Sequence, residues 1–209
     1  MEISKLKRIY HLAITGGPCA GKTEGIKELK TYLSKKGFRV LLIQEIATSM
    51  MKNGIVPYDN CVTQLEFQKI IFEEQLFREN LMYKVAEELQ HDLKIVVIED
   101  RTLMDNKIYL EDNQFEEILE KFNLSEKEVL SRYDLVIHMV SASVQEDVNF
   151  YNRTSNEYRM ENIEEAKRLE LRGKDVWKNH PNIVRVNIMP TFEEKIEKIK
   201  EVVQKFLEF

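Results

Sequence analysis

The chain has 209 residues, of which 43% are hydrophobic and 32% are charged, and its formal net charge is −5. This composition is typical of a folded domain in water, and the acidic balance excludes a generic nucleic-acid-binding protein, which would usually be basic. Two cysteines are too few for a disulfide framework, and no apolar stretch is long enough to span a membrane. We therefore expect a cytoplasmic protein without a membrane span.

The first half of the chain predicts strands and helices in alternation. We predict strands at residues 9–15, 38–43 and 94–98. A helix at 22–36 separates the first two strands, and a long helix at 63–90 precedes the third. Gly37 fits the position after the first helix, because glycine adopts the left-handed conformation that is common there. Thr63 and Glu66 form a capping-box pattern at the start of the long helix. We interpret residues 52–60, which precede that helix, as a loop.

The second half continues the alternation. Residues 102–132 predict two or three short helical pieces, which are followed by a strand at 134–140 and a polar loop at 141–157. A helix at 160–178, a strand at 183–186 and a last helix from 191 onward complete the chain. Ser125 with Glu128 and Thr191 with Glu194 are further capping-box patterns. Five short apolar strands separated by helices predict an α/β fold with a parallel, doubly wound sheet, in a single domain over residues 1–209.

Glycine is scarce in this chain but strongly clustered. There are seven glycines, where average usage predicts about 15. Four of them lie within ten positions, at Gly16, Gly17, Gly21 and Gly25. Because glycine weakens helices and strands, such a cluster needs a local reason.

The cluster contains a motif for binding phosphate. Residues 16–23 match G-x-x-x-x-G-K-[ST] between a predicted strand and a predicted helix, which is the context that this motif requires. In such a loop, backbone N–H groups surround phosphate oxygens, Lys22 reaches the β- and γ-phosphates, and the Thr23 hydroxyl binds Mg²⁺. The alternative is a glycine-rich turn that only joins a strand to a helix. The predicted nucleotide-binding residues are Gly16, Gly17, Pro18, Cys19, Ala20, Gly21, Lys22, Thr23 and Glu24.

Carboxylates follow two of the predicted strands. Asp100 comes after the third strand, and we favour it over Glu99 as a ligand of Mg²⁺, although it could also cap the next helix. Glu45 ends the second strand, on the edge of the sheet where parallel α/β proteins bind ligands. It is a candidate to accept the proton of a substrate hydroxyl, and the alternative is a solvated side chain at a strand end.

Arginines are expected near a transferred phosphoryl group, because its oxygens carry negative charge. We predict a lid at about residues 141–172. The alternative for each of its arginines is a surface ion pair. For Arg168 the candidate partner is Glu164, which lies four residues earlier. The candidates are Arg153, Arg159, Arg168 and Arg172.

Several other polar residues have two interpretations. Gln68, Gln75 and Arg78 lie on the long helix and would line a substrate pocket, but we favour a solvated helix face. Arg101 would contact substrate or pair with nearby acids. We interpret His11 and His138 as core or edge histidines within strands, and Trp177 as a core residue.

Four segments resemble a P-loop ATPase family of AAA/kinase-like type. They are GGPCAGKTE, VIEDRTLMD, HMVSA and YRMENIEEAKRLELRGKDVWKNHP. This family includes ribosylnicotinamide kinase-like domains and the nucleotide-binding domain of the TRPL translocation defect GTP-binding protein. The resemblance implies a three-layer P-loop NTPase fold of nucleoside/nucleotide-kinase type, with a five-stranded sheet in the order 2-3-1-4-5. It implies that Lys22 and Thr23 contact nucleotide and Mg²⁺, that Asp100 lies near the metal, and that Arg159 and Arg172 are the family's arginines.

These observations predict an ATP- and Mg²⁺-dependent phosphotransferase, a kinase acting on a small nucleoside- or nucleotide-like acceptor. The alternative is a regulatory module that binds ATP or GTP, or a slow NTPase. A conventional switch GTPase is disfavoured, because Asn106-Lys107 is not followed by the x-D of a guanine-reading motif. An oligomer is possible. The predicted catalytic residues are Lys22, Glu45, Asp100, Arg159 and Arg172, and the predicted metal ligands are Thr23 and Asp100.

Overall fold

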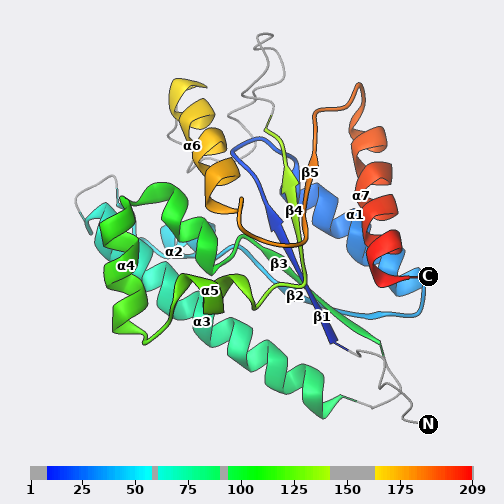
Figure 1. Ribbon diagram of the computed structural model, residues 1–209, viewed down its shortest axis with the longest axis horizontal. Helices are drawn as coiled ribbons and strands as arrows, with labels where there is room; N and C mark the ends of the chain where they lie inside the picture. Colours follow the sequence, from blue (N-terminus) through cyan, green and yellow to red (C-terminus); the bar gives the residue numbers. More distant parts are fainter. Residues whose placement is uncertain (1–8, 58–60, 90–93, 142–162, 209) are drawn as a thin grey trace.

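The protein contains one parallel five-stranded sheet (Figure 1). The computed structural model describes residues 9–57, 61–89, 94–141 and 163–208. The strands stand in the order β2-β3-β1-β4-β5, and every neighbouring pair is parallel. This arrangement confirms the predicted α/β fold and its strand order. The strands are β1 (Ile9–Thr15), β2 (Arg39–Ile43), β3 (Ile95–Asp100), β4 (Leu135–Met139) and β5 (Ile183–Val186).

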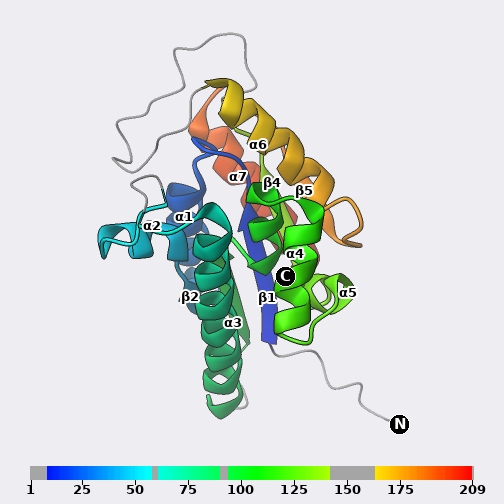
Figure 2. The ribbon, with the colours of Figure 1, turned by 90° about the vertical axis from the view of Figure 1, so that its left-hand side faces the viewer.

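Helices cover both faces of the sheet, which gives three layers (Figures 1 and 2). The α-helices are α1 (Lys22–Lys35), α2 (Ile46–Lys52), α3 (Gln64–Glu88), α4 (Asp112–Lys121), α5 (Glu126–Leu130), α6 (Ile163–Val176) and α7 (Phe192–Leu207). A 3₁₀ helix, η1 (Leu103–Tyr109), follows β3. Across the ranges that the structure describes, no helix is long and apolar enough to cross a membrane.

The two helical layers pack through separate apolar clusters. Helices α1 and α7 pack against Leu12 and Ile98 on one face of the sheet, whereas α3, α4 and α6 pack with Ala13 on the other. Successive side chains of a strand point to opposite faces. Glu99 and Asp100 therefore face different layers, and only Asp100 faces the layer that contains α1.

The observed elements agree closely with the predicted ones, with two differences. Helix α2 lies at residues 46–52, where we predicted no helix. It has fewer than two turns, and its buried Ile46 packs against Phe67 and Ile71 of α3, so tertiary contacts hold it in place. Strand β3 continues through Asp100, two residues beyond the predicted end.

Local capping signals were reliable guides to the helix starts. Thr63 and Glu66 form both hydrogen bonds of a capping box at α3, and Ser125 and Glu128 do the same at α5. Thr191 accepts a hydrogen bond from the Glu194 N–H at the start of α7. Of the residues interpreted as core or edge, His11 and His138 are fully buried, and so is Trp177, which was interpreted as core.

A buried polar network connects β3 with α3. The carboxyl group of Glu99 contacts His11 Nε2 at 2.8 Å and accepts a hydrogen bond from Gln75 Nε2 at 2.8 Å. Glu79, also on α3, hydrogen-bonds with Glu99 and accepts from the Tyr133 hydroxyl at 2.8 Å. Burial raises the pKa of Glu99 to about 8, so this group holds a proton at neutral pH.

We expect Glu99→Gln to make the free energy of unfolding less dependent on pH. The folded-state pKa of about 8 exceeds the ordinary value of 4.5, so the contribution of Glu99 is fully present below pH 4.5 and is lost as the pH rises through 8. Glutamine resembles the protonated carboxyl group, so its introduction removes a slope of at most about 1.4 kcal/mol per pH unit. Urea unfolding between about pH 5 and 8 measures this slope.

The exposed Glu88 on α3 provides the matched control, Glu88→Gln. This variant should keep the pH dependence of the wild type. If Glu99→Gln retains the full wild-type slope, Glu99 is ionised in the folded protein and the proton assignment is wrong.

Candidate functional site

The phosphate loop, residues 16–23, joins the carboxyl end of β1 to the first turn of α1. Gly16 has φ +138°, Cys19 +59° and Gly21 +83°, so the chain turns sharply at three places within the loop. A Cβ atom on Gly16 would lie 2.1 Å from the backbone oxygen of Met139, and one on Gly21 would lie 2.6 Å from the ring of Phe192. The loop therefore requires glycine at these two positions for steric as well as conformational reasons.

The side chain of Lys22 folds back onto the start of the loop. Its ammonium group donates hydrogen bonds to Gly16 O at 2.9 Å and to Gly17 O at 3.1 Å. Burial and, to a smaller extent, the nearby Arg101 lower the pKa of Lys22 to about 8, although the carboxylate of Asp100 opposes the shift. The ammonium therefore remains charged at neutral pH and is held at the loop.

Asp100 meets the requirements for a metal ligand. It lies at the end of β3, directly opposite Ile14 of β1, which leads into the loop. Burial raises the pKa of Asp100 to about 6, although Lys22 opposes the shift. Its Oδ1 atom is buried and has no hydrogen-bond partner among the described residues. An unpaired buried carboxylate oxygen is expensive unless a cation or donor binds there, and oxygen is the atom that Mg²⁺ prefers.

Thr23, the other predicted metal ligand, lies exposed in the first turn of α1. Among the described residues, no group of three or more His, Cys, Asp or Glu side chains is placed to hold a metal ion. A Mg²⁺ ion usually takes one or two protein oxygens and completes its shell with phosphates and water. The hydroxyl of Thr23 and the carboxylate of Asp100 are oxygen donors of this kind, and their assignment as metal ligands stays a prediction.

Glu45 forms an ion pair with Arg101 beside the loop. Arg101 Nε donates to Glu45 Oε1 at 2.6 Å, and the Thr48 hydroxyl donates to Oε2 at 2.7 Å. Burial alone would raise the pKa of Glu45, but the charges of Arg101 and Lys22 outweigh it and hold the pKa at about 2. Glu45 is therefore ionised throughout the neutral range, and Arg101 pairs with an acid, as one of the two interpretations proposed.

Gln75 binds the backbone of Arg101 and so supports this ion pair. Arg101 has a positive φ of 64°, and its carbonyl oxygen accepts a hydrogen bond from Gln75 Nε2 at 2.6 Å. Gln75 is only 2% exposed, and Gln68 is also buried, so the interpretation of both as part of a solvated helix face was wrong. Arg78 pairs with Glu74 on the same helix.

Asp105 is a buried acid of this region that the sequence analysis missed. The Thr15 hydroxyl donates to one of its oxygens, and the Thr102 N–H donates to the other at 2.8 Å. Asp105 also lies close enough to raise the pKa of Lys22 and of Asp100. The signal was present in the sequence, since Thr102 and Asp105 have the spacing of a capping box.

The structure describes only part of the predicted lid. Arg153 and Arg159 lie outside the described residues. Arg172 donates to Leu110 O at 3.2 Å and to Asp112 Oδ1 at 2.5 Å, so this structure shows it paired at the start of α4. Its predicted catalytic role stays a prediction.

Arg168 pairs with Glu165 rather than with Glu164 as expected, at 2.6 Å. The pair forms at a spacing of three residues, which are also neighbours on a helix surface. Glu164 pairs instead with Lys167. Both ion pairs are exposed, which fits the surface alternative for Arg168.

Asn106 does not present its side chain to a nucleobase. It is buried, and its amide Nδ2 donates to Thr102 O at 3.3 Å and to Leu103 O at 3.0 Å. The partial guanine-reading sequence at Asn106-Lys107 therefore has a structural role within η1.

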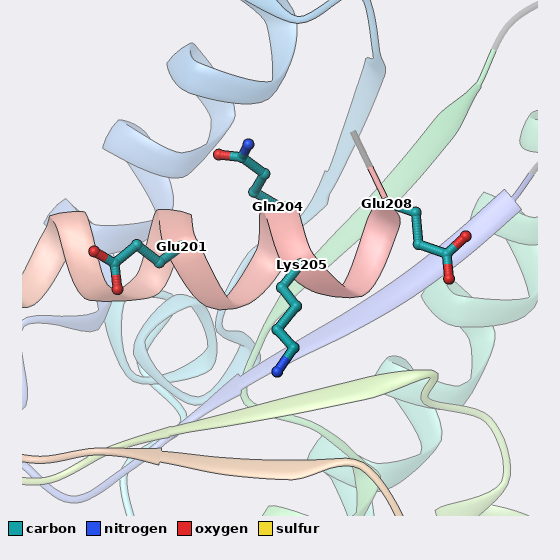
Figure 3. A pocket seen from close by; sticks show the side chains of 4 residues that line it. All are labelled: Glu201, Gln204, Lys205 and Glu208. Carbon is teal, nitrogen blue, oxygen red and sulfur yellow. The ribbon is translucent and has the colours of Figure 1, made fainter.

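A surface hollow at the far end of α7 lacks the features of a ligand site (Figure 3). Its lining residues all come from the end of this one helix, and their side chains point in different directions. The first turn of α7 contacts the phosphate loop through Phe192, so the hollow lies more than two turns away from that loop. The lining residues are Glu201, Gln204, Lys205 and Glu208.

We expect Lys22→Ala to weaken the binding of Mg²⁺-ADP by about 30-fold, because one charge-assisted contact to phosphate contributes roughly 2 kcal/mol. Titration calorimetry measures this affinity. Lys27→Ala is the matched control, since Lys27 lies exposed on the same helix and pairs with Glu24. Equal affinity for ADP and GDP in wild type and Lys22→Ala would contradict the assignment of the phosphate loop.

Comparison with known proteins agrees with this geometry. A family model described as an AAA domain matches residues 11–195, which include the phosphate loop and all five strands except the first two residues of β1. No curated protein matches the chain. The chain therefore belongs to the AAA-domain family of P-loop nucleotide-binding proteins.

Proposed function

We propose that the protein is an ATP- and Mg²⁺-dependent phosphotransferase acting on a small, nucleoside- or nucleotide-like acceptor. One observation carries the proposal. Lys22, Asp100 and the Glu45–Arg101 pair lie close enough at one edge of the sheet to shift each other's pKa values. A phosphate-binding lysine, a metal-binding acid and a second, ionised acid are the groups that a kinase needs together.

The nucleotide would bind along the phosphate loop. Its phosphates would accept hydrogen bonds from the loop's peptide N–H groups and from Lys22, which would exchange its present bonds to Gly16 O and Gly17 O for phosphate oxygens. Thr23 and Asp100 would hold Mg²⁺, which neutralises charge on the phosphate oxygens when it is bound. ATP is our first choice of nucleotide, and GTP is the second.

Glu45 would orient the acceptor and receive its proton. Each oxygen of its carboxylate has one hydrogen-bond donor in the structure, and a carboxylate oxygen accepts a second donor. A carboxylate with a pKa of about 2 is a weak base. Its main contribution is therefore to position the attacking hydroxyl. The proton of that hydroxyl would pass to Glu45 as the new bond to phosphorus forms.

Arg159 and Arg172 remain our proposed arginines for the transferred phosphoryl group. Arg172 lies on α6 and would have to leave Asp112 to reach nucleotide. This ion pair is partly exposed and therefore weak, so its exchange is inexpensive. We also propose one domain over residues 1–209 and a cytoplasmic location, as the sequence predicts.

A regulatory nucleotide-binding module, or a slow NTPase, is the second candidate. The Arg101–Glu45 pair favours it, because a neutralised acid with a low pKa is a poor general base. The two candidates differ in their product. A kinase releases a phosphorylated acceptor, whereas a slow NTPase releases inorganic phosphate and a binding module releases neither.

A metabolite screen with ATP and Mg²⁺ distinguishes the candidates. We expect mass spectrometry to detect a phosphorylated product among nucleosides, nucleotides and ribosylnicotinamide. With that acceptor, Glu45→Gln should lower kcat at least about 100-fold while the affinity for nucleotide changes little. Glu74→Gln, on α3, is the control. If no phosphorylated product is detected in the whole screen, the result favours the binding module. Full activity of Glu45→Gln would show that Glu45 has no role in the reaction.

We expect Asp100→Asn to raise the Mg²⁺ concentration needed for tight ADP binding by about tenfold or more, because the variant loses a charged metal ligand. Titrations of ADP at a series of Mg²⁺ concentrations measure this shift. The affinity for ADP without Mg²⁺ should not fall, since removal of a negative charge favours the phosphates. An unchanged Mg²⁺ dependence would exclude Asp100 as a ligand.

A further inference from the structure

Three buried polar side chains form hydrogen bonds with the backbone of the phosphate loop. They come from different elements and contact different peptides of the loop. Glu170 of α6 accepts a hydrogen bond from Gly17 N at 3.0 Å. Ser141, after β4, donates to Pro18 O, and Lys195 of α7 donates to Ala20 O at 3.0 Å. The sequence analysis assigned no role to any of the three.

Glu170 is the most strongly bonded member of this set. It is 2% exposed. In addition to Gly17 N, its carboxylate accepts from Ser141 N at 3.3 Å and lies 2.7 Å from His138 Nε2. Arg185 of β5 lies 3.7 Å away. Burial opposes the ionisation of Glu170, but the hydrogen bonds from His138, Gly17 and Ser141 outweigh it and lower the pKa of the carboxyl group.

These contacts define what the carboxylate does. An ionised carboxylate can only accept hydrogen bonds, so His138 Nε2 must be a donor. Glu170 therefore receives three N–H groups, one of them a peptide of the phosphate loop. Glutamine cannot replace it, because its amide nitrogen would face at least one of these donors.

The contact between Gly17 and α6 is also tight. A Cβ atom on Gly17 would lie 2.8 Å from Glu170 Oε2, so the loop and the carboxylate fit closely. On the same helix, a Cβ atom on Gly173 would lie 3.4 Å from the ring of His138. Helix α6 is therefore fixed against β4 and the loop at two successive turns.

We propose that Glu170 is a positioning residue that links helix α6 to the phosphate loop, so that nucleotide binding and the anchoring of α6 are coupled. The coupling is reciprocal, because a nucleotide that orders the loop stabilises the Gly17–Glu170 bond, and that bond stabilises α6. This inference rests on the proposed nucleotide site but concerns a residue outside the phosphate-binding motif.

Amide hydrogen exchange tests the link in the protein without nucleotide. We expect Glu170→Gln to exchange about tenfold faster than the wild type in the loop peptide that contains Gly17, because opening of the loop no longer breaks a charge-assisted bond. Glu164→Gln is the matched control, since this carboxylate lies on the same helix and its side chain is 84% exposed. Equal exchange in Glu170→Gln and wild type would overturn the proposal.

Nucleotide provides the second part of the test. In the wild type, Mg²⁺-ADP should slow exchange in α6 as well as in the loop, and this result needs no variant. In Glu170→Gln, the affinity for Mg²⁺-ADP should fall about tenfold and the protection of α6 should be lost. Protection of the loop without any effect on α6 in the wild type would overturn the coupling, even if Glu170→Gln does not fold.

Failure of the nucleotide site gives a different result. If neither ADP nor GDP changes exchange in the wild-type loop, the proposed function is wrong. The comparison of wild type and Glu170→Gln without nucleotide still decides whether Glu170 positions the loop.

Discussion

The whole site depends on one constraint, which is the backbone conformation of the short phosphate loop. The loop requires backbone angles that most residues avoid, and here Gly16 and Gly21 supply them. The loop also presses directly on its neighbours, since Gly16 has room for no Cβ beside Met139 of β4. Its shape is therefore set by the order of the strands, which places β4 next to β1.

At the same edge of the sheet, two acids have pKa values that are shifted in opposite directions. Burial raises the pKa of Asp100 to about 6, whereas Arg101 and Lys22 hold that of Glu45 at about 2 despite its burial. Asp100 has an unsatisfied oxygen and would gain most from a cation. Glu45 already has its positive partner. Environments that drive the pKa values of two neighbouring carboxyl groups apart in this way are typical of sites in which each group has its own function.

The sequence was sufficient wherever the signal is local. Apolar runs identified all five strands, and the capping boxes at Thr63 and Ser125 marked helix starts, because both depend on residues close in the chain. The phosphate loop was predictable for the same reason. Its motif combines local backbone geometry with an adjacent helix N-terminus.

Apart from Asp105, the parts that were missed depend on distant contacts. Gln75 resembles a surface residue until β3 is placed beside α3, where Glu99 and the carbonyl of Arg101 become its partners. Glu170 lies 153 positions after Gly17, so no local pattern connects them. Helix α2 is too short to produce a clear periodicity, and its position depends on the packing of Ile46 against α3. Packing between elements that are distant in the sequence, rather than residue type, decides the role of each of these side chains.

The alternation of β3 finally explains why the buried network and the nucleotide site are connected. Glu99 and Asp100 are adjacent but face opposite layers, so a protonated acid and the acid that we propose as a metal ligand occupy the same strand end. Gln75 donates both to Glu99 and to the carbonyl of Arg101, and Arg101 in turn holds Glu45. The site is therefore supported from both faces of the sheet, by Lys195 of α7 on one face and by Glu170 of α6 and the α3 network on the other.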